Sequence, residues 1–177
     1  MKDSVTVLQS ENTNITDCYL HLVKLAVSIK RNSINTNSSF KKFCDSKFNL
    51  RWKEFNHEGY LLAYFLHPGY KVIVIKYGQF QNIAEIAATY WKSMQKSKKT
   101  CTELLSQLRK YRLQQRPYNA AYNNQYYNPL SWWYTCEDNY DHLQQLAIKL
   151  FSVVPPVVGV NAFFQIWGDF MEKIIKI

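Results

Sequence analysis

Apolar residues recur at helical spacing along most of this chain, and that periodicity constrains the fold more than any other feature. Between Asp138 and Val153 the apolar stripe follows the 3.6-residue period of an α-helix. The same period predicts helices over residues 16–30, 39–55, 79–94, 100–113 and 157–177. Each stripe needs a neighbouring element to cover it, so the sequence predicts a mainly α-helical array.

Proline and glycine mark where some of these segments end. The apolar run Tyr60–Leu66 stops at His67-Pro68-Gly69, because proline disfavours a helical residue before it and glycine permits a turn. We expect His67 to be a turn residue and His142 to be an exposed helix residue. Val and Ile alternate between residues 71 and 77 in a run that fits either state, so one short strand stays an alternative there.

Composition and charge limit the classes of partner and cofactor. The chain has 47% hydrophobic residues, so we expect a folded protein, and its formal net charge of +9 favours an anionic partner over a cationic one. Its four cysteines form no Cys-x-x-Cys pair and no zinc-finger spacing with histidine, which predicts free thiols, no metal and no other cofactor. The sequence contains neither a signal-peptide core nor a membrane-spanning segment. We therefore expect a nuclear or cytoplasmic protein without a membrane partner.

A basic stretch at 96–116 leads into a segment rich in Tyr and Asn. The candidate nucleic-acid contacts in it are Lys98, Lys99, Arg109, Lys110, Arg112 and Arg116. Residues 117–127 have no periodicity and are predicted to form an exposed linker, whose aromatic rings could stack on bases. Two interpretations stay open, a nucleic-acid-binding module or a solvated helix face followed by a flexible loop.

The last predicted helix, 157–177, is unusually apolar. Apolar groups cover so much of its circumference that one neighbour cannot bury them all, which favours a subunit interface over a central core position. The Trp132-Trp133 pair allows the same two interpretations, interface or core. The residues assigned to dimerisation or packing are Trp132, Trp133, Leu146, Leu150, Phe163, Phe164, Trp167 and Met171.

Several motifs, in their order along the chain, resemble one protein family. They are Phe48-Asn49-Leu50-Arg51-Trp52-Lys53-Glu54-Phe55, Leu66-His67-Pro68-Gly69-Tyr70, Asn128-Pro129-Leu130-Ser131-Trp132-Trp133 and His142-Leu143-Gln144-Gln145-Leu146-Ala147. From residue 15 onward this order is similar to the C-terminal third of hAT-superfamily DNA transposases, especially the copies in fungal genomes. The resemblance implies a helical insertion-like region at 15–116, a linker at 117–127 and a C-terminal dimerisation region at 128–177. Residues 1–14 are expected to be a disordered N-terminus.

The resemblance also says what the chain lacks. The hAT catalytic domain is RNase H-like, with two metal ions held by two aspartates and a glutamate. By resemblance the glutamate falls at Asn161 and the neighbouring arginine at Ala162. An amide supplies no charge to anchor a divalent ion, and no segment resembles the strands that carry the aspartates. We therefore expect a non-catalytic protein that has no small-molecule substrate.

The role that the resemblance implies is protein dimerisation. The expected partner is a second copy of the chain or another hAT-type chain. The alternatives are a module that binds DNA or another nucleic acid through residues 96–116, and a decayed transposon fragment without a selected function. Residual transposase activity would require aspartates from another chain.

Self-association can be tested on the last predicted helix. Light scattering after size exclusion should report a dimer for the wild-type chain. Replacing Phe164→Asp or Trp167→Asp should shift it to a monomer, because a buried interfacial carboxylate without a partner is costly. A wild-type chain that is monomeric at high micromolar concentration would contradict the dimerisation hypothesis.

Overall fold

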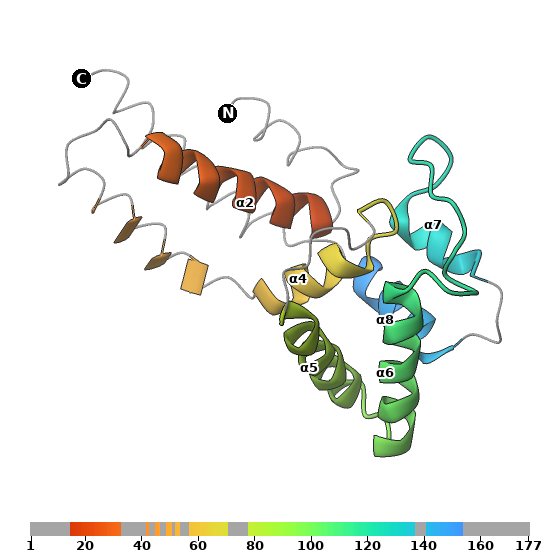
Figure 1. Cartoon of the computed structure of the whole chain (residues 1–177). Helices are drawn as coiled ribbons and strands as arrows, with labels where there is room; N and C mark the ends of the chain where they lie inside the picture. Colours follow the sequence, from red (N-terminus) through yellow and green to blue (C-terminus); the bar gives the residue numbers. More distant parts are fainter. Residues whose placement is uncertain are drawn as a thin grey trace. The chain divides into compact units, whose positions relative to one another are not determined.

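The computed structural model describes residues 15–32, 57–70, 78–136 and 141–153, together with residues 42, 45, 46, 49, 50, 52 and 53. This part of the chain is mainly α-helical and holds no strand (Figure 1), which confirms the predicted fold class. Outside the described residues lie the disordered N-terminus, the alternative strand and the last helix that were predicted at 1–14, 71–77 and 157–177.

The described helices keep close to the predicted segments. They are α2 (Ile15–Asn32), α4 (His57–Leu66), α5 (Gln79–Ser93), α6 (Lys98–Arg112), α7 (Pro129–Tyr134) and α8 (His142–Phe151). The apolar period predicted α2, α5, α6 and α8, whereas the six-residue helix α7 is too short to show a period. Its signal is local, since Asn128 is followed by proline at the first helical position.

The chain divides into two compact units. One comprises residues 1–57 and 154–177 and includes α2. In it the Tyr19 ring lies 6.5 Å from the Trp52 ring, so α2 contacts the segment predicted as a helix at 39–55. The other unit is Glu58–Val153, which contains α5 to α8 and all of α4 except its first residue.

Side-chain caps fix where three helices of the second unit begin. The Ser97 hydroxyl accepts a hydrogen bond from a first-turn N–H of α6 at 3.2 Å. Asn128 and Ser131 form a reciprocal capping box at α7. The Asp141 carboxylate accepts from the Gln144 N–H of α8 at 2.7 Å. These caps satisfy N–H groups that have no partner inside a helix.

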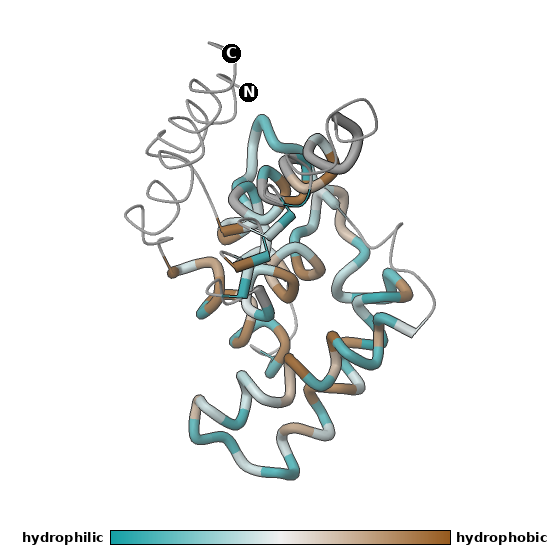
Figure 2. The backbone as a smooth tube through the Cα atoms, turned by 90° about the vertical axis from the view of Figure 1, so that its left-hand side faces the viewer, coloured by the Kyte–Doolittle hydropathy of each residue, from teal (hydrophilic) through white to brown (hydrophobic). Residues whose placement is uncertain are grey.

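The core of the second unit is built from the apolar faces of these helices. Helix α6 packs against α5 and α8, and α7 packs against α8. Polar and apolar positions alternate along the helices, as expected when one face of each is buried (Figure 2). The largest fully buried side chains are Trp91, Trp132, Trp133, Tyr118, Phe65, Leu62, Leu66, Ile83, Leu104, Leu108 and Leu143.

Trp133 joins two of the sequence motifs inside this core. Its indole N–H donates to the backbone carbonyl of Leu66 at 3.0 Å, across 67 positions of sequence. Leu66 is the last residue of α4, so its carbonyl has no helical partner of its own. The Trp133 ring stacks on Tyr111 of α6 with 5.2 Å between ring centroids. One side chain of α7 therefore ties the end of α4 to α6.

Gln144 is a buried polar residue of the same core that the periodicity did not predict. Its amide nitrogen donates to the carbonyl of Trp133 at 2.7 Å and to the carbonyl of Cys136 at 3.1 Å. Both carbonyls lie at the end of α7 or just beyond it. The buried amide therefore donates to two carbonyls at a helix end, and a leucine at this position would remove both hydrogen bonds, leaving the Trp133 carbonyl only the Cys136 N–H at 3.4 Å.

His67 lies in the predicted turn but is buried, with 6% of its surface exposed. Its Nδ1 accepts a hydrogen bond from the Gly69 N–H at 3.1 Å, and its ring lies 4.3 Å from Tyr70 and 5.5 Å from Tyr122. A Cβ on Gly69 would come within 2.8 Å of the Tyr122 ring, so this close packing needs glycine. Burial lowers the pKa of His67 from 6.5 to about 4.

Stability should depend on pH through His67. Its pKa is about 4 in the folded protein against 6.5 in the unfolded chain, so acidification protonates the unfolded chain first. The free energy of unfolding should fall as pH drops from about 6.5 to about 4, by about 3 kcal/mol in all. Urea unfolding followed by circular dichroism at a series of pH values measures this change.

The matched control is His67→Asn. An asparagine oxygen can accept the Gly69 N–H in the same local turn but does not titrate. The pH dependence in this window should flatten in the variant. An equal loss of stability in wild type and variant would contradict the role of His67.

Candidate nucleic-acid interface

Helix α6 presents one basic face to solvent. Successive helical residues are offset by 100°, so Lys98 and Arg109, 11 residues apart, lie on the same side, and so do Lys99 and Lys110. All four side chains are exposed. The rise of an α-helix places the two pairs about 16 Å apart along its axis. Thr102 and Ser106, two of the exposed residues between the pairs, are small and uncharged, and the third is Glu103, which lies four residues after Lys99 and is 50% exposed.

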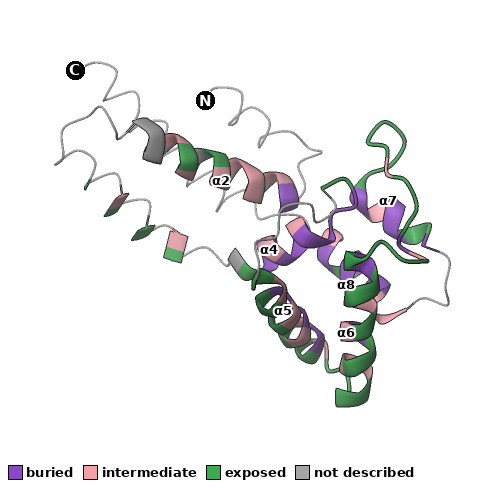
Figure 3. Cartoon of the chain, in the orientation of Figure 1, coloured by how far each residue is buried: buried purple, intermediate pink, exposed green. Residues whose placement is uncertain are grey.

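The opposite face of α6 is buried in the core. Leu104, Leu108 and Tyr111 have at most 2% of their surface exposed. In Figure 3 exposed positions run along much of α6, whereas buried positions dominate α4 and α8. The helix is thus held by one side and leaves the other side free to contact a ligand.

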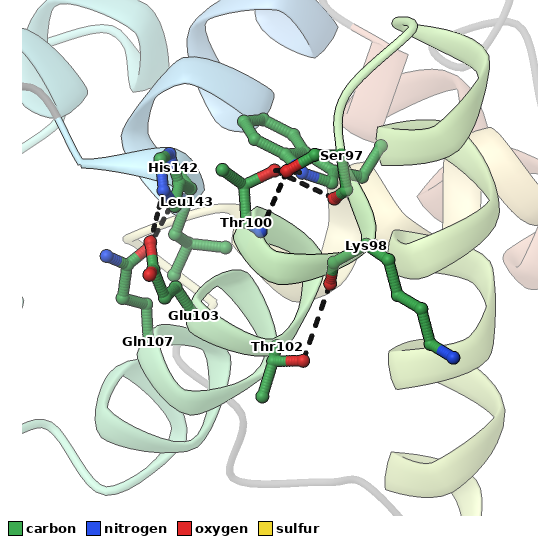
Figure 4. A network of polar contacts seen from close by, with 9 residues as sticks. Ser97, Lys98, Thr100, Thr102, Glu103, Gln107, His142 and Leu143 are labelled. Atoms are coloured by element: carbon green, nitrogen blue, oxygen red, sulfur yellow. Dashed lines mark hydrogen bonds and ion pairs between the residues drawn. The ribbon is translucent and has the colours of Figure 1, made fainter.

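A polar network attaches the same helix to its neighbours (Figure 4). The Glu103 carboxylate contacts His142 Nε2 of α8 at 2.7 Å, and Gln107 Oε1 accepts from the Leu143 N–H at 3.0 Å. Glu103 is the one acidic residue of α6, and its carboxylate contacts α8 although it stands four residues after Lys99. His142 is less exposed than predicted, because its side chain contacts Glu103 and is 24% exposed.

Two cations of the basic stretch lie over aromatic rings. The Arg112 guanidinium is 4.5 Å from the centre of the Phe80 ring of α5, and Lys96 Nζ is 5.5 Å from the centre of the Trp91 ring. These cation–π contacts give both residues a role in packing. Of the predicted contacts, Arg112 is therefore the least available for a ligand. Arg116 follows the helix in an exposed turn.

The cations of α6 lie in both its first and its last turn. Arg109, Lys110 and Arg112 occupy its last turn, where cations stabilise the negative end of the helix dipole. Lys98 and Lys99 occupy its first turn, which contains no acidic residue. Cations there oppose the dipole and cost a few tenths of a kcal/mol each. The helix dipole accounts for the cations of the last turn, but it disfavours the lysines of the first turn. An anion bound at these lysines would offset that cost.

The segment predicted as an exposed linker at 117–127 is exposed only in part. Tyr118 is 1% exposed, so the prediction is wrong at this residue. Its ring lies 5.7 Å from Tyr111 and 5.9 Å from Trp133, and its hydroxyl donates to the Asp141 carboxylate. A low-complexity stretch gives no period that would mark one tyrosine as buried. Tyr126, by contrast, is 78% exposed.

Four of the residues assigned to dimerisation or packing belong to the core. Trp132, Trp133, Leu146 and Leu150 are buried within Glu58–Val153, with at most 6% of their surface exposed. For these side chains the core interpretation holds, and they offer no free surface to a second chain. Outside the described residues lie the other candidates, Phe163, Phe164, Trp167 and Met171, and the degenerate position Asn161.

Neither a metal site nor a membrane-spanning helix is found in the described part of the chain. No three or more His, Cys, Asp or Glu side chains there are grouped so that they could hold a metal ion. No described helix is long and apolar enough to cross a membrane. Comparison with protein-family models, with curated proteins and with solved structures found no match.

Loss of the hydroxyl should change the free energy of unfolding differently at two neighbouring buried tyrosines, Tyr118 and Tyr111. Tyr118→Phe removes a buried hydrogen bond to a carboxylate and should lower the free energy of unfolding by about 2 kcal/mol. The Tyr111 hydroxyl is buried without a hydrogen-bond partner among the described residues, so Tyr111→Phe should leave stability unchanged or raise it by about 1 kcal/mol. Urea unfolding of both variants at pH 7 measures the difference. Equal destabilisation would contradict these assignments.

Proposed function

We propose that the chain is a non-catalytic, transposase-derived protein whose α6 face binds the phosphates of a nucleic acid. The observation that carries the proposal is the placement of Lys98 and Lys99. They stand in the first turn of α6, where they oppose the helix dipole, and on the same face as Arg109 and Lys110. A bound polyanion would offset the cost of these first-turn lysines.

The length of the basic face favours a polymer over a small anion. Two cation pairs about 16 Å apart cannot both contact one phosphate group. Duplex DNA carries about one negative charge per 1.7 Å of its axis, so it would engage both pairs at once. The uncharged Thr102 and Ser106 leave room for a backbone between the pairs, and their hydroxyls can donate to phosphate oxygens.

The resemblance to hAT transposases supports the non-catalytic part of this proposal. Asn161 stands at the position of the metal-binding glutamate, and the aspartates of the family have no counterpart. Association of the chain through 157–177 is a separate prediction from the sequence, and binding by α6 does not depend on it. Strand cleavage that requires Mg²⁺ would contradict the absence of catalysis.

Salt dependence tests the binding function. Binding of labelled duplex and single-stranded oligonucleotides should weaken linearly on a log–log scale of affinity against salt. Four phosphate contacts predict a loss of about 100-fold between 50 and 200 mM salt. The variant Lys98→Gln/Lys99→Gln/Arg109→Gln/Lys110→Gln should bind far more weakly and with a slope reduced by about 1 per lost contact.

The control removes the same charge elsewhere. Lys24, Lys42, Lys53 and Lys149 are exposed and lie outside α6. Changing these four to glutamine gives a chain of equal net charge with α6 intact, and its binding should stay near wild type. Equal weakening in the two quadruple variants would mean that net charge alone is responsible. Affinity that is absent or independent of salt would reject the proposal.

A further inference from the structure

The loop between α6 and α7 is held at both of its ends. Near its start, Tyr118 is buried against Tyr111, a residue of the last turn of α6. Further along, the Tyr122 ring lies edge-on against His67, 5.5 Å away. At its end, Asn128 caps α7 and Trp133 of that helix stacks on Tyr111. The stretch between Tyr122 and Asn128 is therefore anchored at both of its ends by packing and capping contacts.

The tip of this loop is a closed turn that leaves an aromatic ring in water. The carbonyl of Asn123 accepts the N–H groups of Tyr126 and Tyr127 at 3.1 and 3.0 Å, and its side chain accepts the Gln125 N–H at 2.9 Å. Tyr126 is 78% exposed, more than any other large hydrophobic residue in the described part of the chain. The turn thus presents a flat, uncovered ring on a backbone held by hydrogen bonds.

The start of the loop packs against the basic end of α6. Tyr111 contacts Tyr118 near the start of the loop and Trp133 of α7 beyond its end, and it sits between Lys110 and Arg112 in the chain. Arg116 adds a further exposed cation where the loop begins. Tyr126 is ten positions after Arg116, which limits the distance between them to about 35 Å. That distance corresponds to several nucleotides of an extended strand, so phosphates on these cations and a base on Tyr126 can belong to one ligand.

The chemistry of the loop fits unpaired bases. Residues 113–128 contain no acidic side chain, and the tip adds exposed amides at Asn123, Asn124 and Gln125. Amide side chains hydrogen-bond the edges of bases, and aromatic rings stack on their faces. A duplex hides those faces inside its own stack, whereas a single strand leaves them free.

We infer that the ligand of this interface is a single-stranded nucleic acid, with an unpaired base stacked on Tyr126 and its phosphates on the cations at the end of α6. The inference rests on the proposed binding function and names the class of nucleic acid that the site takes. Stacking accepts either sugar, so DNA and RNA single strands both qualify at this position.

The experiment compares strands and variants by fluorescence anisotropy. The probes are a labelled 20-nucleotide oligo(dT), an oligo(U) of equal length and a 20-base-pair DNA duplex. Wild type should prefer the single strands. Tyr126→Ala should weaken single-strand binding between about 5-fold and about 150-fold, because one stacked base is lost, while duplex binding changes little. Tyr126→Phe keeps the ring and should bind like wild type.

Tyr134→Ala is the matched control, because Tyr134 is 60% exposed on α7 outside the loop. Its single-strand affinity should equal that of wild type, and thermal unfolding should show all variants folded. Photocrosslinking from a 5-iodouracil strand should also map to Tyr126 by mass spectrometry.

The outcomes separate this inference from the proposed function. Salt-dependent binding that prefers the duplex, or that is unchanged in Tyr126→Ala, would overturn the single-strand inference and leave the α6 function standing. Binding to none of the probes would overturn both. Preference for oligo(dT) or oligo(U) together with loss in Tyr126→Ala would support the inference and identify which sugar is favoured.

Discussion

The hydrogen bond from the Trp133 indole to the Leu66 carbonyl joins segments that are 67 positions apart, and it is buried inside the unit Glu58–Val153. Leu66 ends α4 just before His67-Pro68, and proline, which has no N–H, cannot continue the helix. A buried carbonyl left without a partner would cost about 1–3 kcal/mol. Because the Trp133 ring also stacks on Tyr111, the same side chain holds α4, α6 and α7 together.

This packing determines which surface is left for a ligand. Leu104, Leu108 and Tyr111 attach α6 to the core, so its basic face must point outward. Glu103, the one acidic residue of the helix, lies beside Lys99 and Lys110 and contacts His142 of α8. The position of the cations is therefore a consequence of how the apolar stripe is buried.

The apolar period predicted much of the fold. The segments 79–94 and 100–113 agree with α5 and α6 within two residues at either end, because burial of one helix face imposes a 3.6-residue repeat on the sequence. Helix α7 is too short for a repeat, although Asn128-Pro129 carries its start signal. The basic residues of the candidate site could be named from the sequence, but the contact of Arg112 with the Phe80 ring could not, because it depends on how α5 packs beside α6.

The sequence by itself determined the helical segments, the positive charge and the order of the motifs, since these depend on neighbouring residues and on composition. Only the tertiary structure decided which polar and aromatic side chains are buried. Tyr118 and Tyr126 belong to one Tyr/Asn-rich stretch, yet Tyr118 is 1% and Tyr126 78% exposed. The physical reason is distance in space. Asp141 and the Trp133 ring lie within reach of Tyr118, and only the fold brings residues so far apart in sequence to that place.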